Sequence, residues 1–583
     1  MFYQQDKSNA KNMSYPFQTI IAKFDLLTIF FGVIVLFAIA LVLLPTSYST
    51  NDDILMEGIA SGLVGGRPDN HLVFINIILG EVLRSLNTFS SSIPWYTGML
   101  ITLQALSVTL VIGGFRNCKI DINKSGWVAI LILFVFHFYI LFDLQFTTTA
   151  HLLSSASLFF ILTTLSLDKF RRGNLFFGVV SFLFAMMLRK ESAILALLVI
   201  VVPIVYILLF TRYKNLGAYI FTFFCLISLS FALIFTDSNA YENSREWKYY
   251  KSINKSRGLL MDGVFFNPKT FEHDLKAKKW SLEEFRTFKG FNPDRKGYSD
   301  IKDLEYFSKQ YMVYAFEKVN EYGLIQIFVQ LLGSLKYFTG LVIIFYIYSF
   351  AQSNKLGRYF IVLTSTIIAL VVLFIAQVIG VKERILFPLL HQFILAIVVS
   401  QSIYGTTLKN RLGRNSGYLY FIFISITIAL EMRGIVLNAF AERKATVSGL
   451  KGWKSVRISA GAIIITHDLF PRLIDDPLHE FNHLRTKQKI KLIPTTWLHH
   501  SPWQTDAILD AGLDTIQSMY VQILNRPNAF VFTNYIKGKQ IGAYLAIKLK
   551  RKVYIESRNL KFAPDTAYLH SYRTTKYVQY LQP

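Results

Sequence analysis

The sequence is poor in charge. Only 17% of its 583 residues are Asp, Glu, Lys or Arg, whereas 53% are hydrophobic and the mean hydropathy is +0.39. A water-soluble domain of this length carries more charge. Apolar runs of about 20 residues recur, and a helix of that length crosses a hydrocarbon core of roughly 30 Å. The composition therefore excludes an ordinary soluble protein and predicts an α-helical polytopic membrane protein.

Cysteine is almost absent, and acidic residues are outnumbered. The two cysteines, Cys118 in a short polar loop and Cys225 inside an apolar run, do not form a disulfide framework. The 61 Lys and Arg exceed the 37 Asp and Glu, giving a net charge of +24. Basic and aromatic residues are not interleaved in a nucleic-acid-binding motif. We therefore expect basic flanks that meet anionic membrane lipid, and no nucleic-acid partner.

Hydrophobicity predicts about eleven spans within residues 1–436, with large loops at 45–94 and 237–328. Short basic loops alternate with the other connections, so the positive-inside rule puts the basic set and the N-terminus in the cytoplasm. We expect a multi-pass protein of a plasma membrane, of the bacterial cytoplasmic type, without a cleaved signal peptide. The expected spans are 24–44, 95–115, 127–143, 149–167, 174–188, 192–211, 216–236, 329–350, 359–379, 385–404 and 418–436.

Residues 437–583 form a separate extracytoplasmic domain in this interpretation. The stretches "AGAIIITHD" and "NAFVFTN" predict short buried strands. The stretch "SPWQTDAILDAG" predicts a helix with Ser501 as N-cap and Pro502 at its first position. Strands that alternate with helices indicate a small α/β fold.

An acidic pair, Asp52 and Asp53, follows directly on the first apolar run in "SYSTNDDILMEG". One Asp is explained by helix capping, because a carboxylate is stabilised at a helix N-terminus. The second needs another partner close to lipid headgroups, and ionisable residues at membrane depth often mark functional sites. The loop continues through "GGRPDNH" into "HLVFINIILGEVLRSL", which predicts an amphipathic helix at the interface.

Cations stand at the outer ends of spans, against the positive-inside bias. A lipid phosphate held near the interface is their natural partner. In "REWKYYKSINKSRGLLMDG", an amphipathic interfacial helix with snorkelling lysines explains the pattern equally well. The candidate phosphate ligands are Arg189, Lys190, Arg257, Lys382 and Arg384.

With these features the sequence resembles the GT-C class of membrane glycosyltransferases, which use polyprenyl-phosphate-linked sugars. The resemblance rests on the N-terminal span followed by an acidic pair in a large outer loop, and on "LQFTTTAHLLSSAS", "LRKES" and "KERILFPLLH". It covers the architecture of the whole chain, including a soluble outer domain after the last span.

The resemblance implies an inverting transfer of a sugar to a glycan, lipid or protein acceptor outside the cell. In this class a loop carboxylate acts as general base, which implies Asp52 as base and Asp53 as its partner, or the reverse. Cations neutralise the phosphate of the leaving lipid. Glu57, Arg67 and His71 of the same loop are further candidate substrate ligands. For His71 the ligand is an acceptor, a phosphate or an optional metal, and an ordinary hydrogen bond at the interface explains this residue as well. No cofactor or metal is expected to be required, although a divalent cation is compatible with the class.

Three other functions compete with this interpretation. A polymerase of lipid-linked oligosaccharides shares the topology and the substrates. A transporter or lipid flippase needs charged or broken helices at mid-membrane, and the spans are mostly uniform apolar runs. The stretch "HEFNH", His479 to His483, matches the short zincin pattern of a metalloprotease but lacks a recognised third ligand. The aromatic stretch "WLHHSPWQTD" fits a sugar-binding surface or an ordinary domain core.

Overall fold

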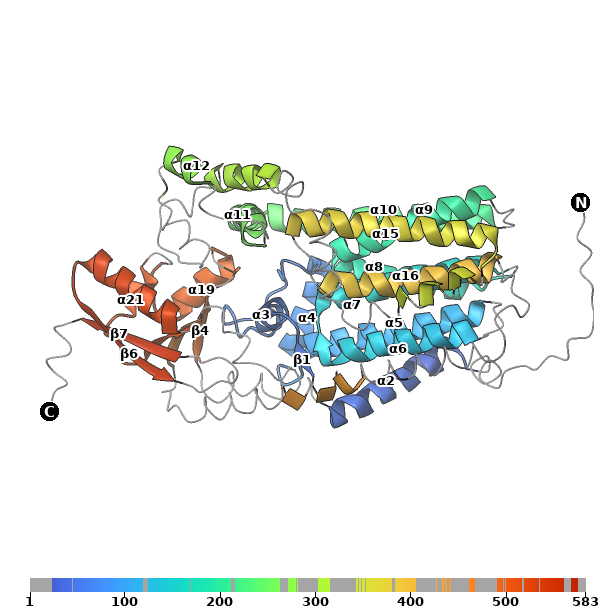
Figure 1. Cartoon of the computed structure of the whole chain (residues 1–583). Helices are drawn as coiled ribbons and strands as arrows, with labels where there is room; N and C mark the ends of the chain where they lie inside the picture. Colours follow the sequence, from blue (N-terminus) through green and yellow to red (C-terminus); the bar gives the residue numbers. More distant parts are fainter. Residues whose placement is uncertain are drawn as a thin grey trace, which may run out of the picture.

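The computed structural model is mainly helical, with a small sheet near the C-terminus (Figure 1). It describes residues 24–44, 46–118, 124–167, 169–210, 215–262, 271–278, 280, 302–314, 353–379, 383–404, 461–466, 490–495, 497–498, 500–515, 518–533, 535–559 and 568–574, with shorter pieces between 342 and 351 and between 426 and 441.

Helices occupy the expected spans wherever the structure describes them. They are α2 (Leu26–Leu43), α5 (Trp95–Asn117), α6 (Lys124–Phe142), α7 (Phe146–Leu165), α8 (Arg172–Leu188), α9 (Lys190–Phe210), α10 (Leu216–Glu242), α15 (Lys355–Ile379) and α16 (Glu383–Tyr404).

Six of these helices, α2, α5, α7, α10, α15 and α16, are long and apolar enough to cross a membrane. The chain thus has the make-up of a helical membrane protein. The expected number of eleven spans is not established: α6, α8 and α9 are not among these six helices, and the predicted spans 329–350 and 418–436 lie largely outside the described residues.

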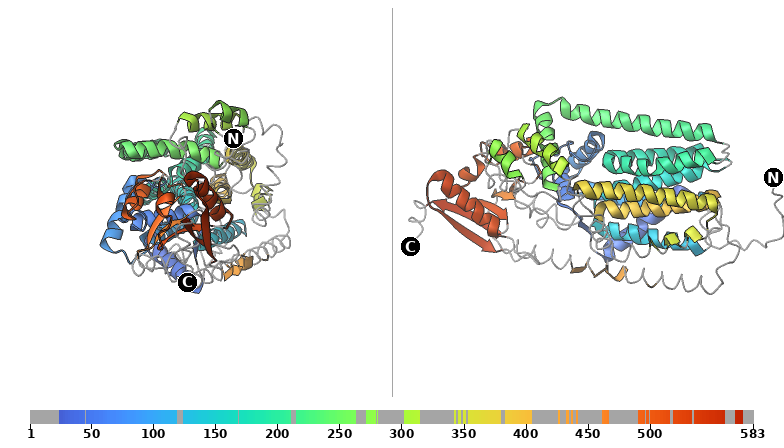
Figure 2. Two further views of the ribbon diagram at one scale, coloured as in Figure 1. Left: turned by 90° about the vertical axis from the view of Figure 1, so that its left-hand side faces the viewer. Right: turned by 45° about the horizontal axis from the view of Figure 1, so that its top comes forward.

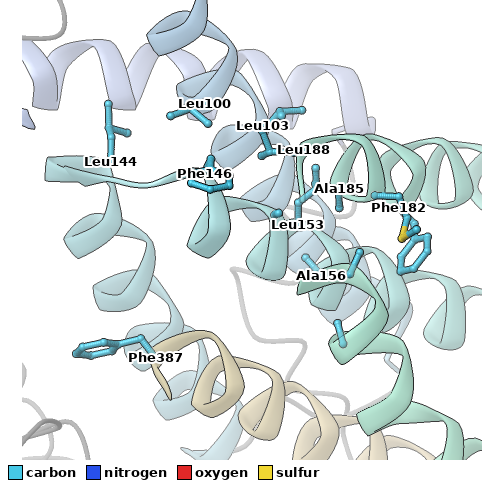
Figure 3. Close-up of a cluster of buried hydrophobic side chains, with 14 of the residues drawn as sticks. Leu100, Leu103, Leu144, Phe146, Leu153, Ala156, Phe182, Ala185, Leu188 and Phe387 are labelled. Atoms are coloured by element: carbon cyan, nitrogen blue, oxygen red, sulfur yellow. The ribbon is translucent and has the colours of Figure 1, made fainter. Parts of the chain in front are cut away.

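Helix α7 is the centre of the bundle, and almost all of its residues are buried. Side chains of α5, α8 and α16 surround it, among them Leu100, Phe182 and Phe387 (Figure 3). Small residues allow this close approach. A Cβ at Gly114 of α5 would lie only 2.2 Å from the ring of Phe159 on α7.

One end of the bundle carries the shorter elements (Figures 1 and 2). Strand β1 (Ser47–Tyr48) pairs in parallel with β2 (Asp143–Leu144), which ties the start of the first loop to the α6–α7 junction. The loop then forms α3 (Asn51–Ser61) and α4 (Ile77–Phe89). Helices α11 (Arg245–Asp262) and α12 (Glu272–Ala277) lie at this same end.

The predicted amphipathic helix of the first loop begins later than its sequence pattern indicates. Val73 has a φ of +57°, which a helix does not allow. Asn76 is the N-cap of α4, and its side chain accepts a hydrogen bond from the backbone N–H of Ile78. The apolar residues before Asn76 are therefore not part of a helix. Phe74 packs against Phe146 and Trp497 instead.

A five-stranded sheet lies beyond this end of the bundle (Figures 1 and 2). Its order is β4-β3-β5-β7-β6; β3 is parallel to β4 and β5, and β7 is antiparallel to β5 and β6. The strands are β3 (Ile463–Thr466), β4 (Lys491–Pro494), β5 (Ala529–Thr533), β6 (Val553–Asn559) and β7 (Tyr568–Thr574). The helices here are α19 (Pro502–Asp510), α20 (Met519–Gln522) and α21 (Tyr535–Leu549).

The predicted local elements of this region are present. β3 and β5 are the two expected buried strands. α19 begins at Pro502, and its N-cap Ser501 accepts a hydrogen bond from the backbone N–H of Gln504. The remaining strands were not predicted. β6 and β7 are rich in polar residues, and their pairing with each other and with β5 comes from tertiary context.

Candidate functional site

Asp53 is a buried carboxylate that joins three segments. Its Oδ1 accepts hydrogen bonds from the hydroxyl of Tyr96 and the backbone N–H of Phe146, both at 2.9 Å, and its Oδ2 accepts one from the hydroxyl of Thr50 at 2.8 Å. Phe146 is the first residue of α7, so Asp53 satisfies one of the unpaired N–H groups at the start of that helix. Capping therefore explains one carboxylate of the pair, although Asp53 caps a helix other than its own.

Burial is the largest influence on the pKa of Asp53. The side chain is 0% exposed. Desolvation raises the pKa of Asp53 to about 7, although hydrogen bonds from Thr50, Phe146 and Tyr96 oppose the shift. A carboxyl group with three donors and no exposed surface is fixed in place and shielded from solvent.

Asp52 is the accessible member of the pair. Its side chain is 21% exposed, and its Oδ2 lies 3.8 Å from Nη1 of Arg384, whose side chain is 29% exposed. Arg384 is the second residue of α16, and its backbone carbonyl accepts a hydrogen bond of 3.4 Å from Thr148 of α7. The structure thus brings the predicted base and one predicted phosphate ligand together, at the end of the bundle that carries α3.

Glu57 lies one turn after Asp53 on the same face of α3. It is 2% exposed, and it accepts a hydrogen bond of 3.3 Å from the hydroxyl of Tyr48. Burial raises the pKa of Glu57 to about 8, against the effect of its hydrogen bonds to Tyr48 and to the backbone of Thr97. Glu57 therefore faces the start of α5 and is shielded from solvent; its role as a substrate ligand stays a prediction.

His71 is oriented by a neighbouring carboxylate. Its Nδ1 lies 2.8 Å from Oδ1 of Asp69, which also accepts the backbone N–H of His71 at 2.7 Å. Desolvation acts to raise the pKa of Asp69, but these hydrogen bonds outweigh it and leave that pKa below its ordinary value. The imidazole stacks on Trp247 of α11, with ring centroids 4.4 Å apart. The sequence signal for this pairing was the Asp-x-His spacing in "RPDNH".

Two other predicted cations meet at the α8–α9 junction. The guanidinium of Arg189 lies over the rings of Phe74 and Phe146, 4.9 and 5.3 Å from their centroids. Nζ of Lys190 lies 3.5 Å from Oδ2 of Asp237 on α10. Both cations line a pocket of about 170 Å³ whose other walls come from the first loop, α10 and α11.

The remaining candidates lie apart from these residues. Arg67 is at an exposed rim, where its Nη2 lies 3.8 Å from Asp506 of α19. Arg257 is buried and donates hydrogen bonds to the side chain of Asn254 and to the carbonyl of Trp497, which is a structural position. Lys382 and the "HEFNH" stretch lie outside the described residues.

The C-terminal region contributes an aromatic cluster whose position the sequence did not reveal. Trp503 of α19 lies edge-on to Trp247, with centroids 4.5 Å apart, and Trp497 packs against Phe74 at 4.9 Å. The hydroxyl of Tyr250 on α11 donates to the carbonyl of Trp497 at 3.0 Å. Both tryptophans are buried, so Trp497 and Trp503 lie at an interface between the C-terminal region, the first loop and α11.

Within the described residues, no group of three or more His, Cys, Asp or Glu side chains is arranged to hold a metal ion. The chain matches no protein-family model and no curated protein sequence. The candidate site thus combines an accessible carboxylate beside an arginine, a buried carboxylate next to it in the chain, an oriented histidine and a basic pocket.

Proposed function

We propose that this protein is an inverting membrane glycosyltransferase. It moves a sugar from a polyprenyl-phosphate donor to an extracytoplasmic glycan, lipid or protein acceptor. The observation that carries the proposal is the division of the acidic pair. Asp52 is accessible and lies beside Arg384. Asp53 is buried and accepts hydrogen bonds from three donors.

In the proposed reaction, the carboxylate of Asp52 takes the proton of the acceptor hydroxyl as that oxygen attacks the anomeric carbon of the sugar. The bond between the anomeric carbon and the phosphate oxygen breaks, and its electron pair leaves with the lipid phosphate. Arg384 is positioned to stabilise the negative charge that gathers there. Direct displacement by one carboxylate inverts the anomeric configuration, because no glycosyl-enzyme intermediate forms.

Asp53 has a positioning role in this scheme. It ties the first turn of α3 to the start of α7 and to α5, which fixes the backbone that carries Asp52. His71, held by Asp69 and Trp247, is a candidate ligand for the acceptor.

The proposed topology has about eleven spans and an N-terminus in the cytoplasm. The end of the bundle that carries α3 then faces outside, together with an extracytoplasmic C-terminal domain. Support comes from the basic loops of the sequence and from the contacts of Trp497 and Trp503 with the first loop and α11. In this arrangement the C-terminal domain shapes the acceptor site.

The test uses purified protein in nanodiscs and a panel of polyprenyl-phosphate sugars. The release of free polyprenyl phosphate is followed for the wild type, Asp52→Asn, Asp53→Asn and Glu480→Gln. We expect Asp52→Asn to lose at least about a hundredfold in turnover. Asp53→Asn, which keeps an oxygen acceptor for its donors, should stay within about tenfold of the wild type.

Full turnover in Asp52→Asn, or no turnover of any donor by the wild type, would contradict the proposal. Glu480→Gln, which alters the zincin pattern, should keep wild-type turnover in this assay. The length of the transferred glycan separates a single-sugar transferase from a polymerase of lipid-linked oligosaccharides in the same assay.

One observation favours a transporter as the second candidate. His391 and His137 are buried inside the bundle with their Nε2 atoms 3.3 Å apart, and Nδ1 of His391 lies 3.0 Å from the hydroxyl of Ser155. Buried ionisable groups of this kind line proton pathways in transporters. Proton-coupled lipid or solute movement in proteoliposomes, lost in His391→Gln and kept in Asp52→Asn, would select this function over glycosyl transfer.

A further inference from the structure

The pocket at the α8–α9 junction has two different kinds of wall. Its apolar side is made by Met186 of α8 and by Leu233 and Ile234 of α10. Helix α10 also presents large exposed apolar side chains such as Phe231 and Phe235, as a lipid-facing helix does. Apolar side chains of α10 thus extend from this pocket to the exposed face of the helix.

The opposite side of the pocket is basic. Four cations line it, two from the α8–α9 junction and two from α11, against the two carboxylates of Glu191 and Asp237, so two positive charges are in excess. Both carboxylates are already engaged: Glu191 lies 3.0 Å from Arg189, and Asp237 lies 3.5 Å from Lys190 and accepts the backbone N–H of Ile77 at 3.1 Å.

The excess charge resides on α11. Lys251 is half-buried, with its Nζ 4.4 Å from the ring centroid of Tyr241, and among the described residues no carboxylate lies within ion-pair distance of it. Burial lowers the pKa of Lys251, because the charged form of the amine is less stable where it is partly removed from water. Lys255, one turn further along α11, is exposed at the same pocket.

We propose that this pocket binds the phosphate head of a single-chain lipid, with Lys251 and Lys255 as its ligands and the chain running along Met186, Leu233 and Ile234. The volume of about 170 Å³ is the space of roughly five or six waters, enough for a phosphoryl group and the first carbons of one chain. Two excess positive charges match the charge of a phosphate monoester. The choice of a lipid phosphate rests on the proposed function, in which the leaving lipid carries this group. Neither Asp52 nor Arg384 lines the pocket, so it would hold the lipid phosphate after the sugar has been transferred.

The experiment measures equilibrium binding of farnesyl phosphate to the detergent-purified full chain by titration calorimetry, with no sugar present. We expect farnesyl phosphate to bind, and binding to weaken about tenfold for Lys251→Gln and further for the double variant with Lys255→Gln. Lys276→Gln on α12, an exposed lysine paired with Glu272, is the matched control and should bind as the wild type does. Melting temperatures of all variants establish that they are folded.

Competitors separate the sources of the anion. Farnesol and millimolar inorganic phosphate should fail to displace farnesyl phosphate. Farnesol lacks the phosphate that the lysines bind, and inorganic phosphate lacks the apolar chain. Equal competition by inorganic phosphate or by phosphatidylglycerol would overturn the proposal in favour of an unselective anion or an annular lipid. Unchanged affinity in the double variant would also overturn it. Binding by Asp52→Asn at wild-type affinity, without sugar transfer by any protein, would uphold this inference while the proposed function fails.

Discussion

Nη1 of Arg384, in the first turn of α16, lies 3.8 Å from Oδ2 of Asp52, in the first turn of α3. The two side chains come from distant parts of the chain and are both partly exposed at one end of the helix bundle. A pair of this exposure contributes little to stability. Because Asp52 directly precedes the buried Asp53 on α3, this pair is the centre of the proposed site.

Removing the cation of this pair should impair transfer without unfolding the protein. We expect Arg384→Gln to lower kcat/KM about tenfold to a hundredfold, because the guanidinium stabilises charge on the leaving phosphate. The melting temperature should change little. Arg84→Gln is the matched control, since it removes another exposed arginine–carboxylate pair, that of Arg84 with Glu81 on α4. Equal losses of kcat/KM in both variants would argue against a specific role for Arg384.

The buried carboxylate should matter for stability. Asp53→Ala leaves the hydroxyls of Tyr96 and Thr50 and the N–H of Phe146 without their acceptor, at a cost of the order of 3 kcal/mol in the free energy of unfolding. Thermal unfolding in detergent measures the loss. Asp52→Ala is the comparison, and we expect it to unfold near the wild-type temperature. If Asp52→Ala is the less stable protein, the assignment of Asp53 as the structural carboxylate and Asp52 as the base is wrong.

The stability of the folded protein should fall as the pH rises from about 4 to about 8. Burial raises the pKa of Asp53 from 3.8 to about 7 and that of Glu57 from 4.5 to about 8. Over this interval the folded state keeps protons that the unfolded state has lost, so raising the pH favours unfolding, by a few kcal/mol. Melting temperatures measured between pH 5 and pH 8.5 test this expectation.

The matched variants for the pH experiment are Asp53→Asn and Glu57→Gln, which resemble the protonated side chains. Each should flatten the slope of melting temperature against pH, and the double variant should flatten it most. A wild-type melting temperature that rises between pH 5 and pH 8 would mean that both carboxyl groups are ionised and stabilised in the folded state, against the expectation from their burial.

Docking of the C-terminal region should depend on aromatic packing more than on charge. Trp503 is 2% exposed and packs against Trp247, so Trp503→Ala should cost about 3–5 kcal/mol and loosen this interface. Limited proteolysis between the helical bundle and residue 461 reports the loosening. The Arg67–Asp506 pair is exposed, and Arg67→Gln should leave the proteolysis rate unchanged. Faster cleavage in Arg67→Gln than in Trp503→Ala would reverse this ranking.

The positions of the apolar helices and the start of α19 could be predicted from neighbouring residues alone. The apolar runs predicted helices at the right places, because hydrophobicity over about 20 residues is a strong signal. Ser501 and Pro502 marked the start of α19, since capping depends on neighbouring residues. The amphipathic pattern before α4 misled at its start, because Asn76 caps the helix and the apolar residues ahead of it pack elsewhere.

The sequence by itself determined that this is a chain of apolar helices with an acidic pair at the start of its first large loop and cations at the ends of helices. It left Asp52 and Asp53 equivalent. Only the tertiary structure separated them: the start of α7 and the hydroxyl of Tyr96 come from distant residues and bury Asp53, while Arg384 reaches Asp52. Burial and long-range contacts set the accessibility and the pKa of a carboxyl group, and no local pattern encodes them.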